Sequence, residues 1–186
     1  MPATILDPHS ALIVVDLQKG LVGRLPAPIW DGVVARSREL VAAFRSHGRP
    51  VVIVTADGGA PGRTELNRHF DVPPGFADPL DGLAHPDDLF VVKQTWGAFT
   101  HGDLAARLKA LGITQVVVIG VATSIGVEST ARQAYEAGFN VTIATDAVAD
   151  LTEENHAHSL ARIFPRLGET GPARDIIALL ADDPHA

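Results

Sequence analysis

The 186-residue sequence contains no cysteine. This absence excludes disulfide bonds, thiolate metal sites and thiol nucleophiles, although it does not by itself identify a compartment. The sequence also has no apolar run long enough to span a bilayer, and its N-terminus carries no basic region followed by an apolar stretch. We therefore expect a soluble, cytoplasmic protein with no membrane partner.

Positive charge is scarce as well. The chain has 15 Lys and Arg residues against 22 Asp and Glu residues, which gives a formal net charge of −7, and its basic residues are scattered along the sequence. A surface of this kind repels a phosphate backbone, so nucleic acid is not an expected partner.

Apolar residues make up 46% of the sequence, and no stretch has the composition of a linker. A chain of this length can bury a core as a single α/β domain over residues 1–186. Strand and helix patterns alternate throughout, which predicts parallel strands joined by right-handed crossovers. The expected fold is a three-layer α/β/α sandwich around a six-stranded, mainly parallel sheet. The expected strands are 11–17, 51–55, 89–92, 116–119, 141–145 and 163–167, and the expected helices are 29–47, 102–111, one starting at Val127, and 172–180.

The stretch 116–139 organises the rest of the chain. Its continuous β-branched run, 116–119, is typical of a central strand buried on both faces, and Gly120 ends that run. The small and hydroxylic residues 121–126 then lead into a helix, whose N-terminal amide groups suit an anion or a developing oxyanion. The predicted sheet-facing positions of that helix are Val127, Ala131, Ala134, Tyr135 and Gly138.

Three separated motifs resemble the isochorismatase-like hydrolase superfamily, which includes nicotinamidases and N-carbamoylsarcosine amidohydrolases. They are Asp-Leu-Gln at 16–18, Lys-Gln-Thr-Trp-Gly-Ala-Phe at 93–99 and the turn Gly-Val-Ala-Thr-Ser-Ile-Gly-Val-Glu-Ser-Thr-Ala at 120–131. Most members carry a nucleophilic Cys in that turn, and the matching residue here is Gly126. The resemblance implies a Rossmann-like fold of this superfamily.

The resemblance also implies site residues. Relatives that use Cys employ the Asp as base, the Lys as its electrostatic partner and the turn amides as an oxyanion hole, so Asp16, Lys93 and Gly126 are the expected catalytic positions. The expected substrate contacts are Gln18, Arg63, Trp96, Phe99, Val121, Ala122, Thr123, Ser124 and Ile125. Arg63 is expected to bind a carboxylate group of the substrate, because a guanidinium can donate two parallel hydrogen bonds to a carboxylate.

Several of these residues have plainer interpretations. Asp16 could bond to loop amides at the end of its strand, although a buried Lys93 needs an ion pair and Asp16 is its natural partner. Trp96 and Phe99 could pack a loop onto the domain instead of lining a pocket. Ser124 could cap the helix that follows it.

The long stretch 57–88 is rich in Gly, Pro and Asp and predicts a surface loop. Metal-dependent relatives place an Asp and His ligands just after the second strand. Here glycines follow Asp57 and His69 lies beyond the usual spacing, while His156 and His158 are two residues apart and point to different faces of a helix. We expect no metal and no cofactor. Asp146 and Asp150 are expected to cap the helix after the fifth strand.

The sequence leaves the chemistry open. Without a nucleophilic Cys, the chain could hydrolyse a small, carboxylate-bearing vinyl ether by protonating its carbon from Asp16, or activate water for direct attack on an amide or ester. The first route needs Asp16 protonated near neutral pH, which burial favours and a nearby Lys93 opposes. Ser124 as nucleophile is a weaker possibility.

Isochorismate itself is disfavoured as the substrate. Ala122-Thr123-Ser124 stands where isochorismatases proper carry Tyr-Ala-His, and GGAPGR replaces their Gln-rich segment after the second strand. The alternative is a superfamily scaffold that lost its nucleophile and serves as a binding or assembly protein. A homo-oligomer, dimer or tetramer, is expected in either case, with Trp30 or the long loop supplying contacts.

Overall fold

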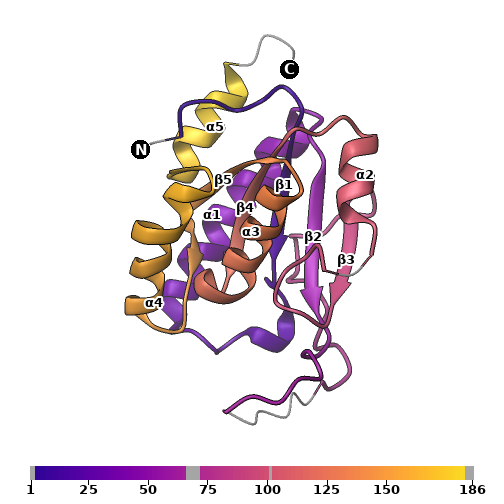
Figure 1. Ribbon diagram of the computed structural model, residues 1–186, viewed down its shortest axis with the longest axis vertical. Helices are drawn as coiled ribbons and strands as arrows, with labels where there is room; N and C mark the ends of the chain where they lie inside the picture. Colours follow the sequence, from indigo (N-terminus) through magenta and orange to yellow (C-terminus); the bar gives the residue numbers. More distant parts are fainter. Residues whose placement is uncertain (1–2, 66–71, 101, 183–186) are drawn as a thin grey trace.

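The computed structural model describes residues 3–65, 72–100 and 102–182. Six strands form one sheet in the order β3-β2-β1-β4-β5-β6, and every neighbouring pair runs parallel. Figure 1 shows the strands at the centre with helices packed around them. The strands are β1 Ser10–Val15, β2 Val51–Ala56, β3 Leu89–Lys93, β4 Gln115–Val121, β5 Asn140–Ala149 and β6 Glu169–Gly171. The predicted fold class is confirmed.

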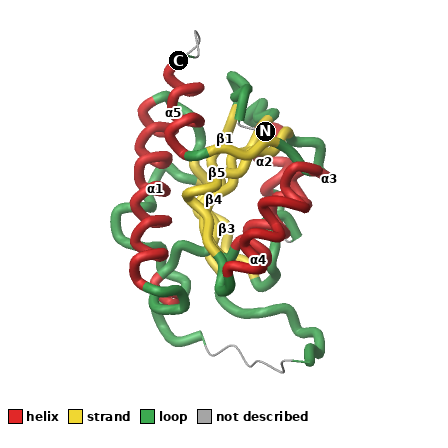
Figure 2. The backbone as a smooth tube through the Cα atoms, turned by 90° about the vertical axis from the view of Figure 1, so that its left-hand side faces the viewer, coloured by secondary structure: helices red, strands yellow, loops and turns green. Residues whose placement is uncertain are grey.

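Helices cover both faces of the sheet. Figure 2 shows α1 and α5 on one side of the strands and α3 and α4 on the other. The α-helices are α1 Ala27–Ser46, α2 Leu104–Ala110, α3 Glu128–Glu136, α4 Glu153–His158 and α5 Ala173–Ala181, and shorter helical segments are η1 Lys19–Leu21, η2 Thr123–Val127, η3 Ser159–Ile163 and η4 Phe164–Arg166. None of the helices in the described ranges combines the length and apolar character that crossing a bilayer requires.

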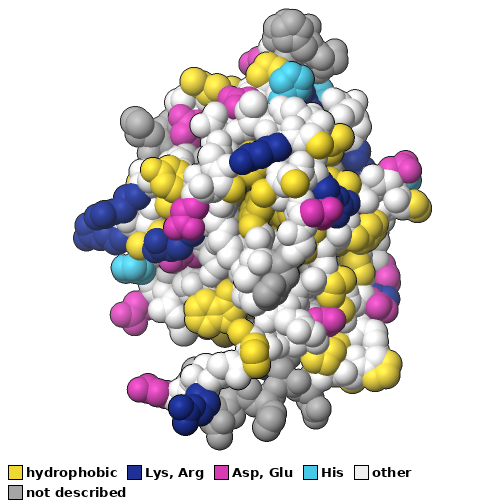
Figure 3. Space-filling view, turned by 45° about the vertical axis from the view of Figure 1, so that its right-hand side comes forward, with side chains coloured by type: hydrophobic (Ala, Val, Ile, Leu, Met, Phe, Trp, Pro, Cys, Tyr) yellow, Lys and Arg dark blue, Asp and Glu magenta, His cyan; other side chains and the backbone are white. Residues whose placement is uncertain are grey.

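Successive residues of β1 alternate between two apolar cores, as the pleat of a strand requires. Leu12 and Val14 face the core under α1 and α5, whereas Ile13 and Val15 face the core under α2 and α3. The central strands are therefore apolar on both faces over most of their length, which is why the sequence shows continuous runs instead of alternation. On the outside, acidic, basic and apolar side chains are mixed over the face drawn in Figure 3.

The sixth strand was placed wrongly. The segment 163–166 is helical and belongs to a continuous helical stretch from α4 to η4. Leu167 lies in the turn that follows, and the strand lies just beyond it at Glu169–Gly171. Pro165 sits at the start of the η4 turn, which its fixed φ favours, and the neighbouring Phe164 is buried in the core under α3. A short apolar run such as 163–167 can form either a strand or a helix, and the sequence pattern alone does not distinguish the two. The packing of Phe164 in the core favours the helical form here.

Two aromatic side chains also differ from expectation. Trp30 is only 6% exposed and packs in the core beneath α1, so it cannot supply an intermolecular contact. Tyr135 is 53% exposed, although the helical pattern placed it against the sheet. The sheet-facing surface of α3 is instead made by Val127, Ala131 and Ala134, whose small side chains allow a close approach.

The stretch between β2 and β3 leaves the carboxyl end of β2 and projects beyond the sheet (Figure 1). Its described residues contain turns and bends, as predicted for a loop, but Phe76 and Leu83 are buried and fix parts of it to the domain. The Phe76 ring lies against Gly20, where a Cβ would approach a ring carbon to 2.1 Å. Gln18 and Pro79 form an isolated β-bridge, which ties the loop to the segment after β1.

The close contact between β1 and β4 gives a test of the fold. Gly120 has a φ of +116°, and a Cβ there would lie 2.0 Å from the carbonyl oxygen of Val15. We expect Gly120→Ala to lower the free energy of unfolding by about 3 kcal/mol or more, because backbone cannot yield as a flexible side chain does. Gly112→Ala is the control, since Gly112 also has a positive φ but open space around it, and about 1 kcal/mol is expected. Equal losses in urea unfolding would contradict the packing described.

Candidate active site

Charged residues from two strands meet at the carboxyl edge of the sheet. Asp16 follows β1 directly and Lys93 is the last residue of β3. The Lys93 ammonium lies 2.8 Å from Asp16 Oδ2, which confirms the predicted ion pair. In a parallel sheet all carboxyl ends share one edge, and the crevice there is the usual ligand site of α/β proteins.

Both members of the ion pair are almost fully buried. Lys93 is 4% exposed and Asp16 is 7% exposed. Asp16 has a φ of +57°, an uncommon backbone conformation for a residue other than glycine, while its amide still donates to Val54 O in the strand ladder. Strained backbone of this kind gathers at functional sites, where the surrounding structure enforces it.

The two carboxylate oxygens of Asp16 have different surroundings. Oδ2 accepts the bond from Lys93, whereas Oδ1 is buried and has no partner within the described ranges. The interpretation of Asp16 as a strand-end residue bonding to loop amides is therefore wrong, because the only group bonded to its carboxylate in the described structure is the Lys93 ammonium. Oδ1 is therefore a hydrogen-bond acceptor that the described residues leave unused.

Burial dominates the electrostatics of Asp16. Loss of hydration raises the pKa of its carboxyl group, and the charge and hydrogen bond of Lys93 lower it, with a net pKa of about 6 instead of 3.8. The sequence left open whether burial or Lys93 has the larger effect on the pKa of Asp16, and the effect of burial is the larger one. A carboxyl group with this pKa is protonated in a useful fraction of molecules near neutral pH.

Gly126 lies against the ion pair. A Cβ at this position would be 2.8 Å from Asp16 Oδ2 and 3.0 Å from Val15 Cγ1. The position therefore faces the Asp16 carboxylate, and no side chain fits there while the pair keeps its geometry. The Gly126 carbonyl accepts a hydrogen bond from Thr130 Oγ1 at 2.7 Å, which fixes the turn to α3.

The turn that carries Gly126 is η2, and three of its amides are already bonded, the Val127 amide among them, which donates to Ala122 O at 3.2 Å. The Ser124 amide donates to Asp150 Oδ2, and the Ile125 amide donates to Ala122 O at 3.0 Å. The peptide bond between Val121 and Ala122 is cis. An oxyanion hole in this turn would therefore use amides other than those of Ser124, Ile125 and Val127.

The predicted helix caps were assigned to the wrong helices. Asp150 caps η2 through Ser124 N, and Asp146 Oδ1 accepts from Ala173 N at the start of α5. Helix α4 is capped by Thr152, whose hydroxyl accepts from Asn155 N. Ser124 is not a side-chain cap of η2 or α3. Each aspartate reaches an element distant in sequence, which local patterns do not reveal.

Gln18 has a structural role that its predicted substrate contact did not anticipate. Its side chain is fully buried, its Nε2 donates to Ala56 O and Phe76 O, and its Oε1 accepts from Ala56 N. These three bonds use the carboxamide to join the end of β2 to the loop that follows. A side chain occupied in this way holds the edge of the site in place, and its contact with a substrate stays a prediction.

The remaining predicted contacts separate into packed and exposed residues. Phe99 packs with Phe139 at a centroid distance of 6.0 Å beside the core under α3, which agrees with loop packing and not with a pocket wall. Trp96 is 64% exposed, so its ring is not packed onto the domain. Arg63 is exposed in the loop after β2.

Two further polar side chains, those of His156 and Asp57, lie near the predicted site residues and were not singled out for this site; the first of them bonds to Thr123, one of the expected substrate contacts. Thr123 Oγ1 and His156 Nδ1 share a hydrogen bond of 2.9 Å, which links η2 to α4. Asp57 follows β2, its amide donates to Lys93 O, and its Oδ1 is buried without a partner in the described ranges. The order of strand ends could have drawn attention to Asp57, but no local signal connects His156 with the turn.

No group of three or more His, Asp or Glu side chains in the described ranges gathers as metal ligands would. His69, which the sequence placed beyond the usual ligand spacing, lies outside those ranges.

Comparisons with known proteins show which family the chain resembles. The profile of the isochorismatase domain matches residues 10–175. The chain is 37% identical to the uncharacterized isochorismatase family protein YecD of Escherichia coli, over 92% of this chain and 96% of that protein. It is 31% identical to the phenazine biosynthesis protein PhzD of Pseudomonas fluorescens, over 81% of this chain and 77% of that protein.

Solved structures show the same architecture. An isochorismatase family protein from Burkholderia thailandensis superimposes with a TM-score of 0.89 at 37% identity, covering 95% of this chain and 98% of that one. The pyrazinamidase of Pyrococcus horikoshii, solved in complex with zinc, gives a TM-score of 0.77 at 25% identity, covering 89% of this chain and 99% of that one.

The buried ion pair predicts a stability that depends on pH. A carboxyl group with a raised pKa stabilises the fold most when protonated, and this contribution is lost as the pH rises through about 6. Lys93→Met removes the cation that holds the pKa down. We expect it to lower the free energy of unfolding by roughly 3 kcal/mol above neutral pH, because an uncompensated buried carboxylate remains, and by much less where Asp16 is protonated.

Lys19→Met is the matched control. Lys19 pairs with Asp81 at 3.1 Å, but the side chains are 49% and 92% exposed. Its loss should cost at most about 1 kcal/mol, with no step near pH 6. Urea unfolding of both variants between about pH 5 and pH 8 compares them. If Lys93→Met lowered the free energy of unfolding only slightly, or by the same amount at every pH, the result would contradict the buried ion pair of Asp16 and Lys93.

Proposed function

This chain belongs to the isochorismatase family of hydrolases, and we propose that it hydrolyses a small, carboxylate-bearing molecule by proton transfer from Asp16, without a covalent intermediate on the enzyme. The observation that carries this proposal is the asymmetry of the Asp16 carboxyl group. Lys93 holds Oδ2 at 2.8 Å, whereas Oδ1 is buried and has no partner in the described structure.

Proton donation suits a vinyl ether. Asp16 in its acid form gives its proton to the terminal carbon of the double bond, which leaves an oxocarbenium ion. Water adds to that ion, and the resulting hemiketal breaks into an alcohol and a carbonyl compound. The Asp16 carboxylate formed in the first step is stabilised by Lys93 and takes a proton back from water or from the hemiketal.

The electrostatics support this order of events. A carboxyl group with a pKa of about 6 is a strong enough acid to donate and still holds its proton in part of the population near neutral pH. Direct attack by water on an amide has weaker support, since it relies on an oxyanion hole and three amides of η2 are already bonded to Asp150 or Ala122.

A protein nucleophile has little support. The sequence has no cysteine, and Gly126 occupies the position that faces Asp16. The Ser124 hydroxyl has no hydrogen-bonded base among the described residues, whereas an activated serine requires one. Ser124 serves the turn through its amide.

The preference for a carboxylate-bearing substrate rests on Arg63 and on the exposed Trp96. Arg63 lies in the loop at the carboxyl edge, where its guanidinium would pair with a carboxylate in bidentate fashion. Trp96 follows Lys93 by three residues, and its exposed ring would cover an apolar part of the substrate.

A homo-oligomer is part of the proposal. Strand β3 is an edge of the sheet, and its side chains Phe90 and Val92 are 46% and 59% exposed. Exposed apolar residues on an edge strand favour association with another copy, which removes them from water. This surface takes the place of Trp30 as the expected contact.

Substitution of Asp16 tests the mechanism. Asp16→Asn keeps the shape of the side chain but cannot donate the proton, so turnover should fall by at least about 10²-fold. Ser124→Ala should retain activity to within about threefold, since its hydroxyl has no catalytic part. The assay is a screen of isochorismate, simple vinyl ethers, amides and esters, with intact-protein mass spectrometry during turnover.

The outcomes are distinct. A rate that falls as the pH rises above about 6 agrees with Asp16 as the acid, whereas a rate that rises over the same range indicates Asp16 as a base that activates water. A covalent adduct on Ser124 would replace the proposal with a serine mechanism. If nothing in a broad panel turned over, the chain would be a binding or assembly protein.

A further inference from the structure

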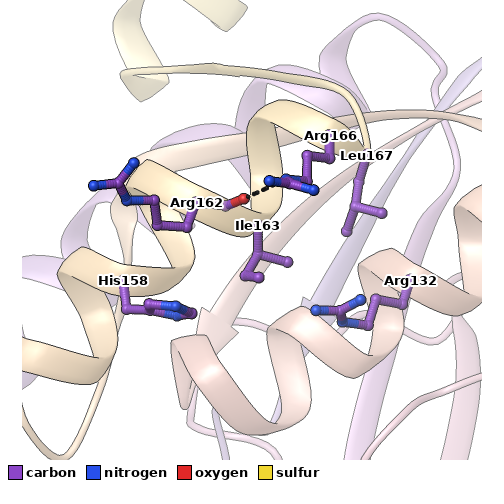
Figure 4. A pocket seen from close by; sticks show the side chains of 6 residues that line it. All are labelled: Arg132, His158, Arg162, Ile163, Arg166 and Leu167. Carbon is purple, nitrogen blue, oxygen red and sulfur yellow. Dashed lines mark hydrogen bonds between the residues drawn. The ribbon is translucent and has the colours of Figure 1, made fainter.

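A surface pocket lies between α3 and the helical stretch from α4 to η4, away from the Asp16 and Lys93 pair. Its volume is about 490 Å³, within the range of small-molecule sites. Figure 4 shows the side chains that line it, which come from α3 on one side and from α4, η3 and η4 on the other. They are Arg132, His158, Arg162, Ile163, Arg166 and Leu167.

Positive charge is concentrated in this pocket, in a chain whose net charge is −7. Three guanidinium groups line it, and no carboxylate does. The only carboxylate paired with them in the described structure is that of Glu128, which lies 2.9 Å from Arg132. Arg162 and Arg166 have no acidic partner within 4.0 Å among the described residues.

This arrangement costs free energy when the pocket is empty. Arg162 and Arg166 are four residues apart, a spacing at which like charges on a helical surface repel. Arg166 is nevertheless fixed, because its Nε donates to Arg162 O at 3.1 Å, the bond drawn in Figure 4. Its terminal nitrogens remain for another acceptor, and an anion would relieve the repulsion.

The arginine on the opposite wall is also held in place. Arg132 Nε donates to Glu128 Oε1 at 3.0 Å, and Glu128 Oε2 accepts a bond from the buried Ser159 hydroxyl at 2.7 Å. Figure 4 shows Arg132 and His158 extending toward each other from the two walls, with Ile163 between them. The pocket therefore has oriented donors on both sides.

The rest of the lining is apolar. Ile163 and Leu167 are partly buried and pack against the core under α3. A bare inorganic anion would leave these side chains and much of the volume without a partner. An organic anion suits both the charged and the apolar parts of the lining. Its charged group pairs with the arginines, and its hydrocarbon part covers Ile163 and Leu167.

We propose that this pocket is a binding site for a small organic dianion of the phosphate monoester class. Guanidinium groups match phosphate geometry in bidentate fashion, and arginines on both walls of one pocket suit two negative charges better than one. The site shares no lining residue with Asp16, Lys93 or Gly126, and the proposal does not rest on the proposed hydrolysis.

Phenyl phosphate is the probe, titrated into the full chain by calorimetry at constant ionic strength. It should bind at least tenfold more tightly than inorganic phosphate, because it also covers the apolar lining, and neutral benzyl alcohol should not bind measurably. Arg162→Gln combined with Arg166→Gln should weaken phenyl phosphate binding at least tenfold. Both side chains are exposed, so the double variant should fold.

The matched control is Arg107→Gln combined with Arg174→Gln. It removes the same charge from helices α2 and α5, outside the pocket. Its affinity for phenyl phosphate should stay within about twofold of the original. Equal weakening in both double variants would show a general charge effect and overturn the site, as would absence of binding at millimolar phenyl phosphate. Loss of binding in Asp16→Asn would assign the ligand to the catalytic edge instead.

Discussion

The buried ion pair of Asp16 and Lys93 is the interaction on which the site depends. Two opposite charges that are each less than a tenth exposed stand at the end of an apolar sheet, and neither can be removed without leaving the other uncompensated. The parallel strand order brings them together from residues 77 positions apart. Gly126 then has to be small, because a Cβ there would reach Asp16 Oδ2 to 2.8 Å. The pair and the glycine in the turn are therefore one structural unit.

That unit explains how a chain without cysteine can keep the chemistry of a hydrolase. In the proposed mechanism the reactive group is the proton on Asp16, so the space opposite it must admit substrate and not a nucleophilic side chain. Burial raises the pKa of the carboxyl group and Lys93 limits the rise, which places it at about 6. A stronger positive charge beside Asp16, or the loss of Lys93, would move the pKa of the carboxyl group away from the range in which it can both hold and donate a proton.

The sequence predicted the sheet well because continuous β-branched runs such as 116–119 have few alternatives to a buried strand. It predicted the meeting of Asp16 and Lys93 because strand ends of a parallel sheet share an edge. It did not predict the partners of Gln18, Asp146 and Asp150, whose bonds join segments far apart in the sequence. Three of the 15 basic residues, Arg132, Arg162 and Arg166, meet at the pocket beside α3 for the same reason. Contacts between side chains that are far apart in the sequence produce no periodic pattern in the sequence, so they cannot be predicted from it.

The central claim is that the folded protein holds the Asp16 carboxyl group partly protonated near neutral pH. Carbon-13 NMR of the aspartate carboxyl groups measures this directly and needs no substrate, with Asp16→Asn identifying the signal. The account predicts that the Asp16 signal titrates with a pKa of about 6. A titration near the ordinary value of 3.8 would contradict it, because Lys93 would then outweigh burial and Asp16 could not act as the acid.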